Sequence, residues 1–194
     1  ATPETFDRIA QTPGAFLLFM DGVARLREAS ITVDFKTVVM RINLAEVEAI
    51  EQTATRHRRI VAEGFMYRHH PVTKKARALV AGGALGTPTI VRGVFTFWMT
   101  RDPDVRLDPA LGGGALWDLG CYPISLARYV LGHEPTEVMA WQRLGLTGVD
   151  EQAAAMLRFP GEVVAHADCG FRSTYRVAFD IVGTEATLTL PNPY

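Results

Sequence analysis

The stretch GGGALWDLGCYPI, residues 112–124, holds two side chains that can exchange protons, four residues apart. Asp118 carries a carboxyl group and Tyr122 a phenol. A tyrosine with its ordinary pKa of about 10 is a poor base at neutral pH, and a nearby ammonium group improves it by lowering that pKa. The stretch therefore indicates either an acid/base pair at the edge of a site or a glycine turn that leads into a helix.

Each of these side chains also has a purely structural interpretation. Asp118 is a suitable N-cap for a helix that begins at Cys121, and Tyr122 can be a buried helix residue whose hydroxyl is tied to the backbone. Arg106 and Asp108, on the loop before the glycines, are placed either to contact a bound ligand or to form a solvated surface pair. The residues alone leave these alternatives open.

A second polar group, Arg68, His69 and His70, follows an apolar run and precedes Pro71. Two adjacent histidines on a strand cannot face the same metal ion, and no carboxylate stands at ligand spacing from them. We therefore expect no metal site. The end of a strand is a common place for a site, so these residues are candidate site residues.

Composition excludes several classes of function. The 194 residues carry 20 Lys and Arg against 21 Asp and Glu, a net charge of -1, which gives no electrostatic reason to expect nucleic acid or an anionic membrane as the partner. Cys121 and Cys169 do not form a CxxC pair, which argues against a metal knuckle or a disulfide scaffold. No export signal is visible, so we expect a cytoplasmic protein, and both termini look truncated.

The elements that must position these residues follow from hydrophobic periodicity. We expect helices over 44–58, from Pro71 to Gly82, and over 121–131. Strands are expected over 60–65, 89–100, 138–144, 152–159, 162–171, 177–181 and 186–190. The pattern predicts an α+β fold: a mostly antiparallel open sheet of about six strands with helices on one face.

The N-terminal segment, residues 1–60, has a different pattern. We expect a helix over 2–9, a strand over 16–20, a helix over 22–29 and a strand over 31–40, which would make an incomplete or atypical α/β segment. No GxG occurs before residue 60, so the glycine-rich turn that brings backbone against a pyrophosphate is missing. We therefore divide the chain into residues 1–60 and an α+β domain over 61–194.

Several motifs resemble one family, in order and spacing. They are AEGFMYRHHP (62–71), VRLDPALGGGALWDLGCYPISLARYVLGHEP (105–135), GVDEQAAAMLRFPGEVVAHADCGF (148–171) and IVGTEATLTLPNP (181–193). Over roughly 44–194 the chain resembles the glucose–fructose oxidoreductase, inositol dehydrogenase and MocA (Gfo/Idh/MocA) family. The nearest branch is its dihydrodiol and sugar dehydrogenases, and the resemblance is mainly to the C-terminal substrate domain.

The resemblance implies hydride transfer between NAD or NADP and a sugar, polyol or diol, and a homo-oligomer that forms through the open sheet face. It implies Tyr122 as the acid/base, Asp118 beside it, and Lys36, in the sequence FKT where the family has E-K-P, as the ammonium that tunes the tyrosine. The alternative is a non-catalytic pseudo-oxidoreductase kept for oligomerisation or carbohydrate binding. The implied substrate-side residues are Arg106, Trp117, Arg68 and His70, and the implied cofactor-side residues are Tyr67 and Arg68.

Overall fold

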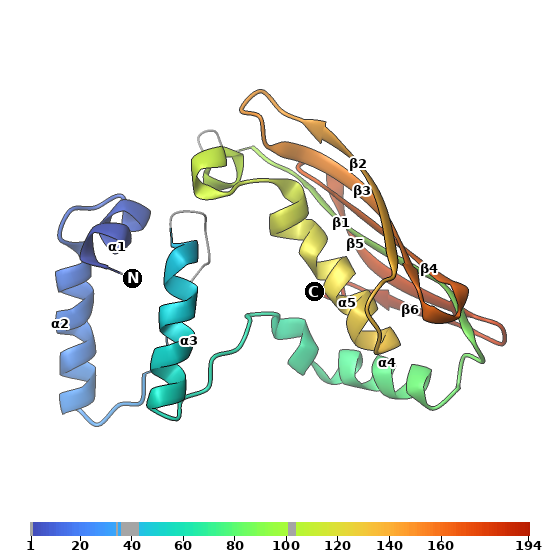
Figure 1. Cartoon of the computed structure of the whole chain (residues 1–194), viewed down its shortest axis with the longest axis horizontal. Coiled ribbons are helices and arrows are strands. Elements are labelled where there is room, and N and C mark those ends of the chain that lie inside the picture. The colour runs from blue at the N-terminus through green and yellow to red at the C-terminus, as the bar shows by residue number, and fades with distance from the viewer. Residues whose placement is uncertain (1, 34, 36–42, 101–103) are drawn as a thin grey trace. The chain divides into compact units, whose positions relative to one another are not determined.

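The computed structural model describes residues 2–33, 35, 43–100 and 104–194 (Figure 1). The chain forms two compact units, Ala1–Gly64 and Phe65–Tyr194, called here unit 1 and unit 2. Among the described residues, no helix combines the length and the apolar character needed to cross a membrane.

The described secondary-structure elements of unit 1 are all helical. They are α1 (Pro3–Ala10), α2 (Ala15–Glu28), a 3-10 turn (Leu44–Glu46) and α3 (Val47–Arg56). The hydroxyl oxygen of Thr2 accepts from the backbone N–H of Thr5 and caps α1. The carboxylate of Asp7 accepts from the N–H groups of Gly14 and Phe16 at 2.7 and 2.8 Å, which fixes the start of α2.

The strands expected in the N-terminal segment are corrected by the structure. Residues 16–20 lie within the helix α2, because an apolar run of five residues has no period of its own and Asp7 caps a helix at this point. Residues 60–65 form neither helix nor strand. Of the strand expected over 31–40, residues 31–33 and 35 are in no strand, and the others lie outside the described residues.

Unit 2 contains one six-stranded sheet in the order β2-β3-β4-β1-β5-β6. The pair β1·β4 is parallel and every other neighbouring pair is antiparallel, which confirms the expected mostly antiparallel sheet. The strands are β1 (Pro88–Trp98), β2 (Glu137–Leu144), β3 (Asp150–Phe159), β4 (Val163–Gly170), β5 (Arg172–Gly183) and β6 (Thr187–Pro191).

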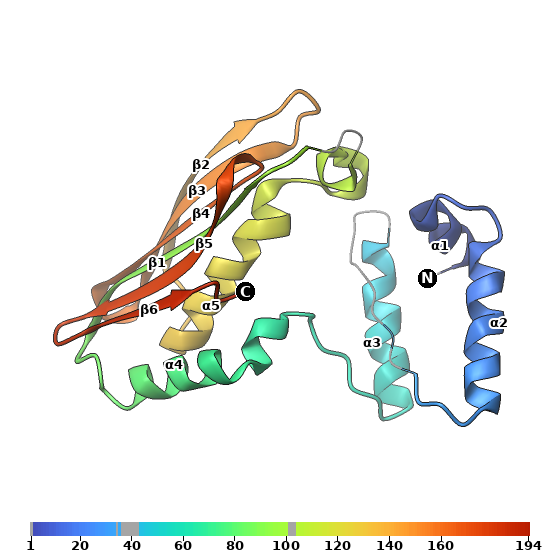
Figure 2. The same cartoon turned by 180° about the vertical axis from the view of Figure 1, so that it is seen from behind.

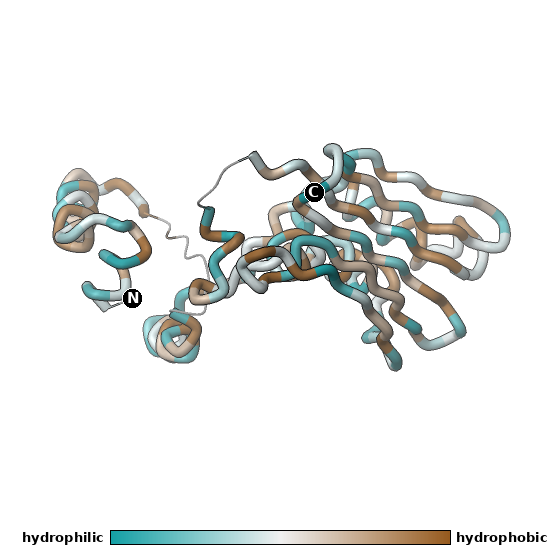
Figure 3. Tube along the Cα trace, turned by 90° about the horizontal axis from the view of Figure 1, so that it is seen from above, coloured by the Kyte–Doolittle hydropathy of each residue, from teal (hydrophilic) through white to brown (hydrophobic). Residues whose placement is uncertain are grey.

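Alternation along the strands gives the sheet one buried face, and Figure 3 shows hydrophobic and hydrophilic residues following one another along the strands. Val91, Phe179 and Ile181 on this face are fully buried. They pack with Leu126 of α5 (Cys121–Leu131), which lies along the face, and α4 (Pro71–Ala81) packs beside α5. In Figures 1 and 2 both helices of unit 2 lie on the same side of the sheet, as the hydrophobic pattern predicts.

Candidate active site

The three glycines of residues 112–114 form a turn that is packed against the preceding loop. The N–H of Gly113 donates to the carbonyl of Asp108, and the N–H of Gly114 donates to the carbonyl of Arg106, both at 2.9 Å. A Cβ on Gly113 would overlap the carbonyls of Arg106 and Asp108, and Gly114 has a φ of +136°, which side-chain-bearing residues rarely adopt. Glycine is therefore required at both positions to hold the loop.

The segment after the glycines is a π-helix, Leu116–Gly120, that runs directly into α5. Its first turn is held because the carboxylate of Asp150, on β3, accepts from the N–H of Leu116 at 2.6 Å. Asp118 lies inside this π-helix and does not cap α5, whose preceding residue Gly120 has helical dihedral angles. The structure thus rules out the N-cap interpretation of Asp118, and π-helical turns of this kind are frequent at functional sites.

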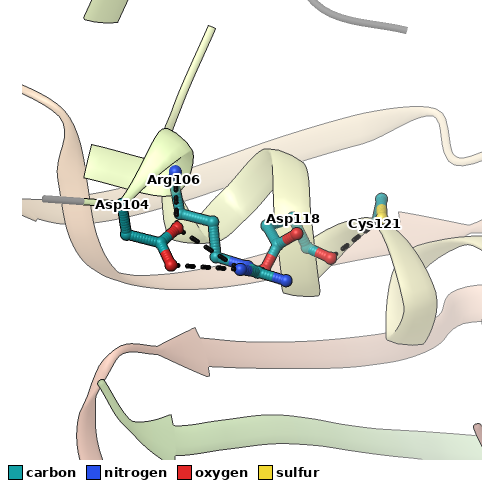
Figure 4. Close-up of polar contacts among 4 residues, drawn as sticks. All are labelled: Asp104, Arg106, Asp118 and Cys121. Carbon is teal, nitrogen blue, oxygen red and sulfur yellow. Dashed lines mark hydrogen bonds and ion pairs between the residues drawn. The ribbon is translucent and has the colours of Figure 1, made fainter. Parts of the chain in front are cut away.

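The side chains of Asp118 and Arg106 form a hydrogen-bonded ion pair (Figure 4). The Nε of Arg106 donates to Oδ2 of Asp118 at 2.7 Å, and its terminal nitrogen lies 3.3 Å from Oδ1 of Asp104. Burial lowers the pKa of Arg106, but the two carboxylates outweigh this and leave its pKa above the ordinary value. All three side chains are partly exposed, so the array presents charged hydrogen-bonding groups to the solvent at a fixed place.

Asp104 was missed from the sequence, although it completes this array. Its Oδ1 accepts from the N–H of Arg106 at 2.9 Å and so fixes the loop from which the guanidinium extends. The only sequence signal is the spacing Asp104-x-Arg106, which is too common on surface loops to be specific. Asp108, which was expected beside Arg106, accepts instead from the N–H of Ala110 at 2.8 Å and caps a short turn.

Tyr122 lies in the first turn of α5, half-buried among aromatic rings. Its ring centroid is 5.5 Å from that of Phe65, 5.6 Å from Phe95, 6.0 Å from Tyr67 and 5.5 Å from Tyr194. Burial raises the pKa of Tyr122, Cys121 and Asp118 raise it further, and Arg106 lowers it in part. Tyr122 is therefore a protonated phenol at neutral pH, held by its ring contacts.

The other predicted site residues fall into two places. Tyr67 is buried in the aromatic cluster with Tyr122, and Trp117 lies in the π-helix with its side chain 64% exposed. The guanidinium of Arg68 instead lies over the ring of Tyr129, near the far end of α5. His70 caps α4, since its Nδ1 accepts from the N–H of Val72 at 3.3 Å. Lys36 lies outside the described residues.

The described residues can be compared with what a metal ion and a nicotinamide cofactor each require. Within the described residues no three His, Cys, Asp or Glu side chains are placed to hold a metal ion. The described part of unit 1 has helices but no strand, so it does not form the strand–turn–helix cradle that a dinucleotide pyrophosphate needs. The described residues of unit 1 therefore supply no such pyrophosphate cradle for NAD or NADP.

The open sheet with helices on one face is the fold that the sequence motifs predict for a C-terminal domain of the Gfo/Idh/MocA family. Residues 73–189 match the description "GFO/IDH/MocA C-terminal domain", and the chain belongs to the Gfo/Idh/MocA family. This confirms the resemblance and the fold class expected from the sequence motifs.

The relatives include enzymes named for diols and sugars. The chain is 30% identical over 154 residues to trans-1,2-dihydrobenzene-1,2-diol dehydrogenase of Xenopus tropicalis, covering 79% of this chain and 46% of that protein. It is 32% identical over 127 residues to D-xylose 1-dehydrogenase (NADP(+)) 2 of Haloferax volcanii, covering 65% and 39%. The chain thus spans about half the length of the curated relatives it matches.

A solved structure shows the same fold. Aldose-aldose oxidoreductase from Caulobacter crescentus, complexed with glycerol, aligns with a TM-score of 0.70 at 26% identity, over 77% of this chain and 46% of that one. An inositol dehydrogenase homologue from Azotobacter vinelandii, complexed with NAD+, aligns with a TM-score of 0.65 at 22% identity. The aligned share is again about half of each relative.

Proposed function

We propose that the protein is an NAD(P)-dependent oxidoreductase that acts on a sugar, polyol or diol, and that this chain supplies the substrate side of the reaction. The activities and cofactor in the names of the relatives support the class of reaction. The observation that carries the proposal is Tyr122, a phenol with a raised pKa beside the Arg106–Asp118 pair.

In this proposal Tyr122 exchanges a proton with the oxygen of the carbon that is oxidised or reduced. A protonated phenol can donate to a carbonyl oxygen as it becomes a hydroxyl, and the phenolate can accept a proton in the reverse direction. Asp118 accepts hydrogen bonds from substrate hydroxyls and Arg106 donates them, while the exposed indole of Trp117 gives the carbon skeleton an apolar surface. The electrostatic effect of Asp118 and Arg106 on the phenol of Tyr122 supports these roles.

Two further expected roles are part of the same proposal. Lys36 is the ammonium that would lower the pKa of Tyr122 enough to make a phenolate accessible. Tyr67, packed against Tyr122, is the proposed cofactor-side residue. Arg68 and His70 have no role in the proposal, because the guanidinium of Arg68 lies over Tyr129 and His70 caps α4. NAD and NADP are both consistent with the names of the relatives.

The proposal is tested by titrating the purified chain with NADPH and with NADH, following quenching of tryptophan fluorescence and the nicotinamide emission. Saturable binding in the micromolar range, reversed by an excess of the oxidised cofactor, would show that the chain holds the cofactor without a glycine-rich turn. Turnover with a panel of aldoses, polyols and vicinal diols then identifies the substrate. Absence of binding up to millimolar cofactor would overturn the cofactor-dependent activity of this chain.

A second candidate, an assembly function, is favoured by the sheet face that no described helix of unit 2 covers. Met139 and Met156 pair across β2 and β3 on this face, next to Trp141, and all three are exposed. A hollow farther along the face is lined by charges of both signs, including Arg92, Asp168 and Asp180. An exposed apolar surface with charges of both signs suits a second copy of the chain.

We therefore expect the chain to form a homo-oligomer, and Trp141→Glu to dissociate it into monomers, because the substitution places a charge in the apolar interface. Analytical ultracentrifugation of both proteins measures this. Leu146→Glu is the matched control, since Leu146 is fully exposed on the loop after β2. A monomeric unsubstituted chain, or equal dissociation by the control, would contradict the assembly.

A further inference from the structure

A second pocket lies at the opposite end of α5 from Tyr122. Its volume is about 290 Å³, near the lower end of the range for small-molecule sites. Tyr129, in its wall, follows Tyr122 by seven residues, which is about 10 Å along a helix. The pocket is therefore separate from the Arg106–Asp118 array. It is lined by Arg68, Arg77, Arg128, Tyr129, Gly132, His133 and Glu134.

The pocket is organised around the ring of Tyr129. The guanidinium carbon of Arg68 lies 5.0 Å from the ring centroid, and that of Arg77 lies 4.6 Å from it. Both distances are within the range of cation–π attraction, so the ring holds two cations near one another. Arg68 comes from the turn before α4 and Arg77 from α4 itself, so three separate segments converge here.

The positive charge of the pocket is not balanced by its one carboxylate. Glu134 is occupied by Arg128, whose Nε and terminal nitrogen donate to its two carboxylate oxygens at 2.7 and 2.8 Å. Neither Arg68 nor Arg77 forms an ion pair or side-chain hydrogen bond with any residue that the structure describes. Among the described residues, these two guanidinium charges therefore have no counter-ion.

The Nε of Arg68 provides an independent sign of a missing acceptor. This nitrogen is buried, yet it has no hydrogen-bond partner among the described residues. A buried donor without a partner costs roughly 1–3 kcal/mol, so native structures seldom leave one unsatisfied. The C-terminal end of α5 offers a partial negative charge to nearby cations, but that is about half a charge and supplies no hydrogen bond here.

We propose that this pocket binds a phosphate group, held between Arg68 and Arg77 beside the Tyr129 ring. The planar fork of a guanidinium matches two phosphate oxygens, and two such forks balance a dianion. The volume leaves room for a small organic substituent on the phosphate. The ligand class is therefore inorganic phosphate or a small phosphate monoester, which share the same recognised group.

The test is calorimetric titration of the chain with inorganic phosphate and with glycerol 3-phosphate, at constant ionic strength set with sodium chloride. We expect one saturable site with a Kd of about 1 mM or tighter. Equal affinities indicate a site for the free ion, and tighter binding of glycerol 3-phosphate indicates a site for an ester. Both results support recognition of the phosphate group.

Variants connect the binding to the pocket. Arg77 is exposed, so Arg77→Gln should fold normally while it weakens phosphate binding at least tenfold. Lys75→Gln removes the same charge from the same helix outside the pocket lining, and it should bind phosphate within twofold of the unsubstituted chain. No saturable binding, or equal weakening by both variants, would overturn the proposal. The measurement needs no nicotinamide cofactor, so it is independent of the proposed oxidoreductase activity.

Discussion

Tyr122→Phe is expected to lower the turnover number of the NAD(P)-linked reaction by about 100- to 10,000-fold, the usual contribution of a general acid or base. The phenol oxygen is the only atom removed, and in the proposed reaction it is the atom that exchanges the proton. Substrate affinity should change little, because the proposal assigns hydroxyl recognition to Asp118 and Arg106, which form an ion pair. Steady-state kinetics in both directions, with separate kcat and KM values, measure this.

The fold should tolerate this substitution. The contacts of Tyr122 in the structure are made by its ring, which meets the rings of Phe65 and Phe95 edge-on, and phenylalanine retains that ring. Tyr175→Phe is the matched control, because Tyr175 is exposed on β5 and takes no part in the site. We expect unchanged thermal unfolding in both variants and unchanged turnover in the control alone.

The pH profile separates a proton-transferring role from a structural one. Burial raises the pKa of Tyr122, so the phenolate is scarce at neutral pH and its share grows about tenfold with each pH unit below that pKa. The oxidation rate should therefore rise with pH, whereas reduction, which uses the protonated phenol, should stay level until the pKa is reached. Tyr122→Phe should abolish the rise. An unchanged slope in the variant would assign the proton to another group.

The strands of the sheet were predictable because their hydrophobic pattern is local and periodic. In β4 every second residue from Val163 to Cys169 is buried, and this two-residue alternation is visible in the sequence. Glycine turns and prolines set the ends of the elements. The pairing order of the strands could not be predicted in this way, because the parallel contact of β1 with β4 joins segments about 70 residues apart.

The site was predictable only in part, for a related reason. Asp118 and Tyr122 belong to one continuous motif, so the resemblance points to both as candidates. The partners that position them come from elsewhere: Asp104 and Arg106 from an irregular loop, and Asp150 from β3. Loop geometry and side-chain pairing have no sequence period, and the apolar run at residues 16–20 shows that a short run does not by itself distinguish a strand from a helix.

The position of Tyr122 relative to the sheet depends on a glycine in β1. Gly93 faces α5, and a Cβ added there would overlap the Cβ of Pro123, the residue after Tyr122, and lie 3.0 Å from the ring of Phe179. Pro123 and Phe179 are both fully buried, so neither can move aside into solvent. The helix that carries Tyr122 therefore approaches the sheet more closely than any residue with a side chain would permit.

We accordingly expect Gly93→Ala to destabilise unit 2 by about 1–3 kcal/mol, the usual cost of overpacking a core. It should also lower turnover by up to about 100-fold, because a displacement of 1 Å suffices for a loss of that size. At a position with open space, Gly→Ala would stabilise the fold by about 0.4–1 kcal/mol, because it lowers the conformational entropy of the unfolded chain. Destabilisation would therefore show that the added methyl group overlaps its neighbours. Urea unfolding and steady-state kinetics give the two quantities.

A double-mutant cycle with Pro123→Gly identifies the contact responsible. Removing the Cβ of Pro123 opens the space that the new methyl group needs, so the free-energy cost of Gly93→Ala should fall by at least half in that background. If Gly93→Ala costs the same free energy of unfolding with and without Pro123→Gly, the contact with Pro123 does not determine how closely α5 packs against the sheet. If Pro123→Gly lowers the free-energy cost of Gly93→Ala and also restores turnover, the position of Tyr122 depends on Gly93 of the facing strand. The proposed proton transfer would then depend on the same glycine.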